Sequence, residues 1–370
     1  MLLVQATRDA LLKTLSTVVG IVERRQTLPI LANVLITKQG SDVSFMANDM
    51  EMQITTRADF GVGESQEQTT VAARVLLDIL RAMPEQEELG LRLKDNKLIV
   101  QSAHSRFALQ TMDAAGYPSM TIPEQWSTTV TLSQHKLKQL LGTVHFAMAQ
   151  QDIRYYLNGM LLVIEPGWLR TVATDGHRLA HNATEIEGAE QSINVIVPRK
   201  TVMEMQRLLS DDKEETVDIS VSDGQIRFYF SGVELVSKLV EGKFPDYARV
   251  IPANYSRHFL IHREQLQSSL QRAAILTSDK FRGVRIQLEK NQMKISATNT
   301  EQEEAREDLQ IEYSYEPLDV GFNVNYLLDV LSNLRTEEVR WSVHPDANAS
   351  VLITTPEQEA FKYVVMPMRI

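Results

Sequence analysis

Residues 171–180 read TVATDGHRLA, and the triplet inside them, Ala173-Thr174-Asp175, has counterparts elsewhere in the chain. It returns in related form as Ala47-Asn48-Asp49 and as Ala297-Thr298-Asn299. The spacings are 126 residues (173 − 47) and 124 residues (297 − 173). A repeat of this length has the size of a whole domain, so the pattern predicts one kind of domain that occurs three times.

Two further anchors recur at nearly the same period. A helix-like run with a polar residue ahead of an apolar stretch recurs at Arg74, Lys200 and Asn325, spaced by 126 (200 − 74) and 125 (325 − 200) residues. A proline near the end of each unit recurs at three places: Pro118, Pro245 and Pro367. We therefore expect three domains, with boundaries at 1–125, 126–253 and 254–370.

Each predicted domain opens with an amphipathic helix and closes with strands of alternating polarity. In the first domain Thr7 is the expected N-cap, and the helix that follows carries one apolar stripe: Leu11, Leu12, Leu15, Val18 and Val19. Near its end, apolar residues alternate before a turn at Asp95-Asn96, which indicates a hairpin. Strand pairs and a second helix lie between, so the expected fold class is α+β.

Composition excludes several classes of protein. The 370 residues include no cysteine, which rules out disulfides, thiolate metal sites and cysteine nucleophiles. No apolar run approaches the ~20 residues of a membrane span, and charges follow the apolar N-terminus too soon for a signal peptide. We expect a cytoplasmic protein with no membrane partner.

The charge pattern is informative because its overall sign and its local sign differ. The formal net charge of −10 argues against binding nucleic acid over the whole surface. The polar faces of the predicted helices are nevertheless basic: Arg8, Lys13, Arg74, Arg81, Lys136, Lys138, Lys200 and Arg207. On one helix this is ordinary solvated charge, but on several equivalent helices it is typical of a face apposed to a phosphate backbone.

Two motifs of the second domain admit a structural and a functional interpretation. In the run 151–159, Tyr155 and Tyr156 beside an arginine are able to stack on bases, although paired tyrosines more often lie in a core or at its rim. Asp175 and His177 look like catalytic groups, but the other repeats do not carry them and no nucleophile motif accompanies them. His177 and His181 lack a third ligand, so we expect neither catalysis nor a metal.

Opposite charges on the first and last domains suit a head-to-tail contact between chains, although ordinary surface charge is an equal explanation. The late strands of the first domain are basic, and the third domain is acidic around residues 301–308. Two chains would then supply six domains and twelve helices. Helices packed about 9 Å apart would enclose an opening of roughly 25 Å, enough for a DNA duplex.

Several longer stretches resemble one family, the bacterial sliding clamps, which are the beta subunits of DNA polymerase III. They are TLPILANVLI, QDIRYYLNGMLL, TVATDGHRLA, IVPRK, KLVEGKFPDYARV, KFRGVR, GFNVNYLLDVL and YVVMPMRI. The resemblance covers essentially the whole chain. It implies three DNA-clamp domains per chain and a head-to-tail homodimeric ring with inner helices and outer β-sheets. Such a ring encircles double-stranded DNA without regard to sequence and has no catalytic residue, metal or cofactor.

The resemblance also implies partners and site residues. The partners would be the DNA polymerase III alpha subunit, an ATP-driven clamp loader, and other polymerases and repair proteins that carry a clamp-binding peptide with Gln and bulky apolar residues, all at the nucleoid. DNA contacts are expected at Arg25, Arg74, Gln151, Tyr155 and Tyr156. A partner-peptide pocket is expected at Leu157, Thr174, Gly176, His177, Arg178, Leu179, Pro245, Arg249, Val250, Val365, Met366, Pro367, Met368 and Arg369. At the dimer interface, Phe107 of one chain should meet Ile275 and Leu276 of the other.

We therefore interpret the chain as a processivity factor for DNA polymerase. Two other classes of function remain open to test: an enzyme that uses Asp175 and His177, and an adaptor that never surrounds DNA. Loss of turnover in His177→Ala would indicate the enzyme, whereas equal binding to linear and circular DNA would indicate the adaptor.

Overall fold

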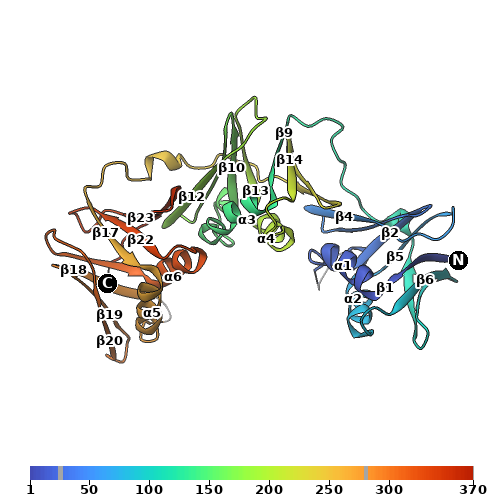
Figure 1. Cartoon of the computed structure of the whole chain (residues 1–370), viewed down its shortest axis with the longest axis horizontal. Coiled ribbons are helices and arrows are strands. Elements are labelled where there is room, and N and C mark those ends of the chain that lie inside the picture. The colour runs from blue at the N-terminus through green and yellow to red at the C-terminus, as the bar shows by residue number, and fades with distance from the viewer. Residues whose placement is uncertain (24–27, 279–281, 370) are drawn as a thin grey trace. The chain divides into compact units, whose positions relative to one another are not determined.

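The computed structural model of the chain describes residues 1–23, 28–278 and 282–369. In these residues one order of elements occurs three times: a strand, a helix, four strands, a second helix and three strands (Figure 1). The predicted triplication and the predicted α+β class are both confirmed.

The elements of the first repeat are β1 (Leu2–Thr7), α1 (Arg8–Val19), β2 (Asn33–Gln39), β3 (Asp42–Asn48), β4 (Met52–Asp59), β5 (Gln66–Ala72), α2 (Ala73–Ala82), β6 (Glu88–Lys94), β7 (Lys97–Gln101) and β8 (Arg106–Met112). Those of the second are β9 (Thr128–Ser133), α3 (Gln134–Gly142), β10 (Gly159–Glu165), β11 (Trp168–Thr174), β12 (Arg178–Glu185), β13 (Ile193–Pro198), α4 (Arg199–Leu208), β14 (Thr216–Ser222), β15 (Gln225–Phe230) and β16 (Val233–Lys238). Those of the third are β17 (Arg257–His262), α5 (Arg263–Ala274), β18 (Gly283–Glu289), β19 (Gln292–Thr298), β20 (Glu304–Gln310), β21 (Leu318–Asn323), α6 (Val324–Asn333), β22 (Glu338–Val343), β23 (Val351–Thr355) and β24 (Gln358–Val365).

The chain divides into two compact units that do not coincide with the repeats. The first unit comprises Met1–His135 and Arg207–Leu239, and the second comprises Lys136–Gln206 and Val240–Ile370. The second repeat therefore contributes strands to both units. This follows from the way in which the strands pair, because sheets run from one repeat into the next.

In the first unit, all strands belong to one antiparallel sheet of twelve, in the order β1-β6-β7-β8-β5-β2-β3-β4-β16-β15-β14-β9. The repeats join where β4 pairs with β16. In the second unit, a sheet of eight runs β13-β10-β11-β12-β24-β23-β22-β17, and its repeats join where β12 pairs with β24. A separate sheet of four runs β20-β19-β18-β21.

The helices bury the apolar stripes that the sequence predicts. In α1, the buried side chains are those of Leu11, Leu15, Val18 and Val19, and in α6 they are those of Val324, Leu327, Val330 and Leu331. Thr7 is the N-cap of α1, and its hydroxyl accepts a hydrogen bond from the amide of Ala10 at 3.4 Å. Burial of these faces against the sheets is the main stabilising term in each repeat.

One residue of the predicted basic face has a structural role. The guanidinium of Arg8 donates to the carbonyl oxygens of Leu80 and Arg81, at 2.8 and 3.2 Å, where α2 ends. Arg263, which also opens its helix, donates likewise to the carbonyl of Leu331 near the end of α6, at 3.2 Å. Both arginines satisfy carbonyls that a helix end leaves without partners. Arg8 is therefore a helix-capping residue.

The hairpin turn predicted at Asp95-Asn96 is confirmed. Lys94 pairs with Lys97, so the loop has two residues, and both have positive φ (50° and 57°). Asparagine and aspartate tolerate this left-handed region better than most residues, and the turn twists in the sense that β6 and β7 need.

The strand edges left without a full partner among the described residues include those of β8 and β20. β20 lies at the end of the four-stranded sheet, and its outward edge has no partner among the described residues. β8 pairs with β7 along its length, but on its other side only Thr111 and Met112 pair with β5. Unpaired strand edges are places where another strand can add.

Among the described helices, none has the length and apolar character to cross a bilayer.

Candidate functional site

A cavity of about 230 Å³ lies in the second unit, beside the joint between β12 and β24. Its lining is mainly apolar, with two arginines: Arg154, Tyr156, Leu157, Thr174, Gly176, Arg178, Leu179, Pro245, Tyr247, Val250, Val364 and Met366. Pockets that enclose a whole drug-sized ligand usually measure roughly 300–1,000 Å³. The smaller volume here favours one or two apolar side chains of a longer ligand.

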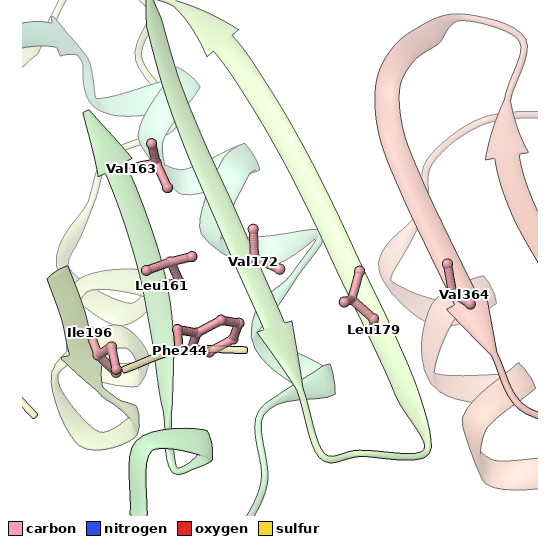
Figure 2. Close-up of a cluster of buried hydrophobic side chains, with 7 residues drawn as sticks. All are labelled: Leu161, Val163, Val172, Leu179, Ile196, Phe244 and Val364. Atoms are coloured by element: carbon pink, nitrogen blue, oxygen red, sulfur yellow. The ribbon is translucent and has the colours of Figure 1, made fainter. Parts of the chain in front are cut away.

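The floor of the cavity rests on a buried cluster of side chains from several strands: Leu161, Val163, Val172, Leu179, Ile196, Phe244 and Val364. Figure 2 shows Leu179 and Val364 on neighbouring strands, with Val172 on the strand beside Leu179. Leu179 pairs with Val364 in the ladder between β12 and β24. Because the cluster is closely packed, the floor is a fixed surface rather than a loop that must fold on binding.

Arg178 places a buried cation at this floor. Its side chain is only 9% exposed, and all three nitrogens of the guanidinium have acceptors. Nε donates to Asp175 at 3.0 Å, Nη1 to Asp329 at 2.6 Å, and Nη2 to the carbonyl oxygen of Phe146 at 2.7 Å. Burial of a charge is costly unless it is paired and hydrogen-bonded, and here both conditions are met.

Aromatic rings complete the surroundings of Arg178. The guanidinium carbon lies 4.4 Å from the ring centroid of Tyr326 and 5.8 Å from that of Phe146. Burial disfavours the charged form, yet the pKa of Arg178 is raised, because the oxygen of Tyr363 and the carboxylates of Asp329 and Asp175 lie beside it. The group is a permanent cation that links η3 (His145–Ala147), β12 and α6.

The carboxylate of Asp175 holds the turn between β11 and β12 together. The carboxylate of Asp175 accepts hydrogen bonds from the amides of His177 and Arg178, at 2.9 and 3.1 Å, and from the side chain of Arg178. Gly176 has a φ of 93°, and a Cβ there would lie 3.1 Å from the guanidinium of Arg154. The acid and the glycine thus shape the turn.

Residues 151–158 form the other border of the cavity. Arg154 binds the carboxylate of Asp152 through two nitrogens, at 3.0 and 2.9 Å, and also donates to the carbonyl of Asp175 at 3.2 Å. The hydrogen bonds from Arg154 lower the pKa of Asp152 to about 2, so that carboxylate is ionised at neutral pH. The hydrogen bond from Arg154 to the carbonyl of Asp175 ties the 151–158 segment to that turn.

The cavity includes eight of the residues expected in the pocket: Leu157, Thr174, Gly176, Arg178, Leu179, Pro245, Val250 and Met366. It also includes four that sequence reasoning missed: Arg154, Tyr156, Tyr247 and Val364. Six expected residues lie outside the lining: His177, Arg249, Val365, Pro367, Met368 and Arg369.

Strand geometry and pairing account for part of this difference. Val365 is fully buried, and Val364 faces the cavity instead, because neighbours on a strand point to opposite faces. The side chain of Arg249 is 85% exposed and binds Asp246 at 2.8 Å. Alternation along 358–365 was a signal from which Val364 could have been predicted.

The residues expected to contact DNA fall in different parts of the chain. Arg25 lies outside the described residues. Arg74 is exposed on α2 in the first unit, and its guanidinium donates to the carbonyl of Val22. In the second unit, Gln151 is exposed with a φ of 55°, and Tyr155 is 58% exposed.

The paired tyrosines have different environments. Their rings lie edge to face, with centroids 6.0 Å apart. Tyr155 projects into solvent, whereas Tyr156 is half-buried, lines the cavity and packs on its apolar cluster. Only Tyr155 therefore presents a ring on which an external base could stack.

The residues expected at a dimer interface are exposed apolar groups. Phe107 on β8 is 37% exposed, and Ile275, directly after α5, is 77% exposed. Leu276 is half-buried beside it.

Among the residues that the structure describes, no three His, Asp or Glu side chains group as metal ligands.

Three family models of the DNA polymerase III beta subunit match the chain. The N-terminal domain model matches residues 2–121, the central domain model residues 131–246 and the C-terminal domain model residues 248–369. The beta sliding clamp of Pseudomonas aeruginosa is 44% identical over 365 residues, and that of Escherichia coli K12 is 42% identical over 365 residues. In both comparisons the match covers 98% of each chain.

Solved structures agree with these matches. The sliding clamp of Pseudomonas aeruginosa bound to griselimycin has a TM-score of 0.95 at 42% identity, with 100% of both chains covered. Pol III beta of Caulobacter crescentus has a TM-score of 0.91 at 34% identity, again with 100% of both chains covered.

The pH dependence of stability should reveal the buried histidine behind Tyr247. The His181 ring stacks on Tyr247, with centroids 5.8 Å apart, and burial lowers the pKa of His181 from 6.5 to about 4. Between these values the unfolded chain binds a proton that the folded chain does not. The contribution of His181 to the free energy of unfolding is therefore complete above pH 6.5. It falls towards pH 4 by about 1.4 kcal/mol per pH unit.

The substitution His181→Gln should remove this contribution, because its amide can still donate to the carbonyl of Ala360 that now accepts from Nδ1 of His181 at 3.0 Å. We expect the thermal midpoint to fall less between pH 7.5 and pH 5 in the variant than in the wild type. Equal falls would contradict the assignment.

Proposed function

The chain belongs to the family of DNA polymerase III beta subunits, the beta sliding clamps, and on that premise we propose which of its surfaces carry the function. A beta sliding clamp is a non-catalytic processivity factor, a ring that encircles duplex DNA and tethers the polymerase. We further propose that this chain works in the cytoplasm at the nucleoid, where bacterial DNA is replicated.

The cavity beside β12 and β24 is the proposed binding site for partner peptides. Its apolar lining and modest volume suit one or two bulky side chains, and Arg154 and Arg178 supply the donors that would orient a peptide. Met366 is 45% exposed, and its flexible thioether can adapt to different side chains. A relative crystallised with griselimycin supports a ligand site in this family.

One such site explains how a single clamp serves several proteins in turn. The proposed partners are the alpha subunit of DNA polymerase III, the clamp loader, and other polymerases and repair proteins with a clamp-binding peptide. They share a short linear motif rather than a fold, so each can occupy the same apolar cavity. The motif proposed from the family resemblance contains Gln and bulky apolar residues.

DNA is held in the proposed ring by enclosure with weak contacts rather than by adhesion. The net charge of −10 disfavours close binding to a polyanion over the whole surface. Arg74, Gln151 and Tyr155 are exposed and offer a cation, an amide and an aromatic ring. Contacts of these kinds do not require a particular base sequence. Tyr156 is proposed to serve the peptide pocket instead.

The free edges of β8 and β20 are the proposed joint between two copies. Within one chain the fourth strand of a repeat pairs with the last strand of the next: β4 with β16, and β12 with β24. The fourth strand of the third repeat, β20, and the last strand of the first, β8, are left over. Pairing them between two copies would repeat the same joint and close the ring.

The register of this joint follows from equivalent positions. In each repeat the anchor alanine lies opposite one residue of the fourth strand: Ala47 opposite Ile54, Ala173 opposite Ala180, and Ala297 opposite Ala305. The equivalent residues of the last strands are found in the same way in each repeat. From the same position of the first strand, three successive strand pairings lead to the last strand, and they end at Phe107, Leu235 and Tyr363.

The two joints within the chain pair these very positions. Leu235 lies opposite Ile54, and Tyr363 lies opposite Ala180. By the same rule Phe107 of one copy lies opposite Ala305 of the other, which sets the basic residues around β8 against the acidic residues around β20.

An aromatic contact inside the chain supports the predicted role of Ile275. The rings of Phe146 and Tyr363 pack with centroids 5.6 Å apart. Phe146 lies 13 residues (146 − 133) after the residue that precedes its helix, and Ile275 lies 13 residues (275 − 262) after the corresponding His262. Because Tyr363 corresponds to Phe107, the equivalent contact between copies joins Ile275 to Phe107.

Peptide binding tests the proposed pocket. Met366→Ala should raise the Kd for a fluorescein-labelled peptide that contains Gln, Leu and Phe by about three- to tenfold, because a half-exposed apolar side chain contributes about 1 kcal/mol to such a contact. Fluorescence polarisation gives the Kd. Met203→Ala is the matched control, because Met203 is 42% exposed on α4 and does not line the cavity. Equal Kd values for both variants would refute the proposed pocket.

Retention on circular DNA tests enclosure. Protein loaded by a clamp loader should stay on nicked circles through gel filtration and leave when a single cut makes them linear. The double variant Ile275→Ala, Leu276→Ala should sediment as a monomer and should not be retained. Retention on linear DNA with free ends, or retention of a monomeric variant, would favour adhesion over enclosure.

A further inference from the structure

The ion pair between Arg178 and Asp329 connects the floor of the cavity to a helix that contributes nothing to its lining. Asp329 lies on α6, outside the lining of the cavity, and its carboxylate accepts from Nη1 of Arg178 at 2.6 Å. Its side chain is 42% exposed, whereas that of Arg178 is 9% exposed. The contact therefore joins a buried pocket residue to a partly exposed acid of the third repeat.

The guanidinium donates three hydrogen bonds, and their acceptors lie in three different parts of the second unit. Asp175 belongs to the turn between β11 and β12, Phe146 to η3, and Asp329 to α6. The first two acceptors belong to the second repeat, as Arg178 does. Among these three acceptors, only the carboxylate of Asp329 belongs to the third repeat, which also supplies Val364 and Met366 to the cavity. Asp329 therefore ties the guanidinium itself to the repeat that forms the other wall of the cavity.

Further hydrogen bonds join the strand of Arg178 to the third repeat. Arg178 lies opposite Val365 in the ladder between β12 and β24, and the amide of Met366 donates to the carbonyl of His177 at 2.9 Å. The hydroxyl of Tyr363 donates to the carbonyl of Tyr326 on α6 at 2.8 Å, and Tyr326 lies under the guanidinium. A shift of Arg178 would move the strand end that carries Met366.

The corresponding positions in the other repeats show that this arrangement is not required for the fold. At the joint between β4 and β16 the place of Asp329 is taken by Glu204, the sixth residue of α4. In the first repeat the sixth helix residue is Asp78, which pairs with Arg81 at 3.6 Å with 74% of its side chain exposed. Met52 holds the place of Arg178, the second residue before the one opposite the anchor alanine. The joint between β4 and β16 thus forms with a methionine there.

We infer that Asp329 is a positioning residue for the peptide pocket, which acts by holding the Arg178 guanidinium against the floor of the cavity. The inference rests on the proposed peptide-binding function. Loss of the carboxylate charge leaves Nη1 without its charged acceptor and loosens the guanidinium, which then keeps its hydrogen bonds to Asp175 and Phe146 and its contact with the Tyr326 ring. The peptide then meets a floor that must be ordered on binding, and its affinity falls.

The test compares peptide Kd values for the full-length protein and its variants by fluorescence polarisation with the labelled Gln, Leu and Phe peptide. Asp329→Asn should raise the Kd about three- to tenfold, the range of one weakened charge-assisted hydrogen bond. Asp78→Asn is the matched control, because it makes the same change at the equivalent helix position without an arginine of this kind, and its Kd should stay within about twofold of the wild type. Circular dichroism melts establish that each variant is folded.

A double-mutant cycle separates positioning from general weakening of the structure. Arg178→Met copies the residue that the first repeat carries at this place, and it should weaken peptide binding by itself. If Asp329 acts through Arg178, adding Asp329→Asn to Arg178→Met should leave the Kd unchanged. Effects that multiply would overturn the inference, as would an unchanged Kd in Asp329→Asn alone. If the wild type did not bind the peptide, the proposed function itself would fail, which is a separate result.

Discussion

Pairing of strand edges from one repeat to the next is the constraint on which the rest of the structure depends. Backbone donors and acceptors at a strand edge need partners, and the chain satisfies them by joining β4 to β16 and β12 to β24. Because each joint uses the fourth strand of one repeat and the last strand of the next, three repeats always leave one edge of each kind. A single chain thus keeps two complementary edges, and the proposed dimer satisfies them by the same pairing.

The cavity is a product of one of these joints. Its walls come from strands of two repeats, with Leu179 on β12 and Val364 on β24, and Arg178 on β12 adds a buried cation to the lining. The joint between β4 and β16 has the same ladder but carries Met52 where the second joint carries Arg178. Repetition therefore supplies the scaffold, and residues such as Arg178, which the first joint lacks, distinguish the joint at which we propose the peptide site.

Much of the fold could be predicted from local patterns. Anchor spacing indicated three repeats, apolar stripes indicated the helices, and Asp95-Asn96 indicated its turn, because each of these signals lies within a few residues. The pairing of β12 with β24 joins residues about 180 positions apart, and no local pattern encodes it. The position of Arg8 on its helix predicts a place in the basic face, whereas the carbonyls that it caps lie more than 70 residues away along the chain.

The site shows the same division between local and long-range information. Resemblance to a family predicts eight of the lining residues, but it places Tyr156 among the DNA contacts and gives no role to Tyr247 or Arg154. Those residues belong to segments whose approach to the turn at Asp175 depends on long-range contacts, such as the hydrogen bond from Arg154 to its carbonyl. The role of Asp329 is likewise invisible until the two repeats are joined.

The most direct test of the central claim is a disulfide between the two edges that the chain leaves free. The chain has no cysteine, so Phe107→Cys with Ala305→Cys introduces the only thiols. Opposite residues in an antiparallel pair have Cα atoms about 4.5–5.5 Å apart, within the range of a disulfide. Mild oxidation should convert this variant to a covalent dimer on a non-reducing gel, while Phe107→Cys with Glu303→Cys, two residues out of register, should form far less. No covalent dimer, or equal yields in both, would contradict the account.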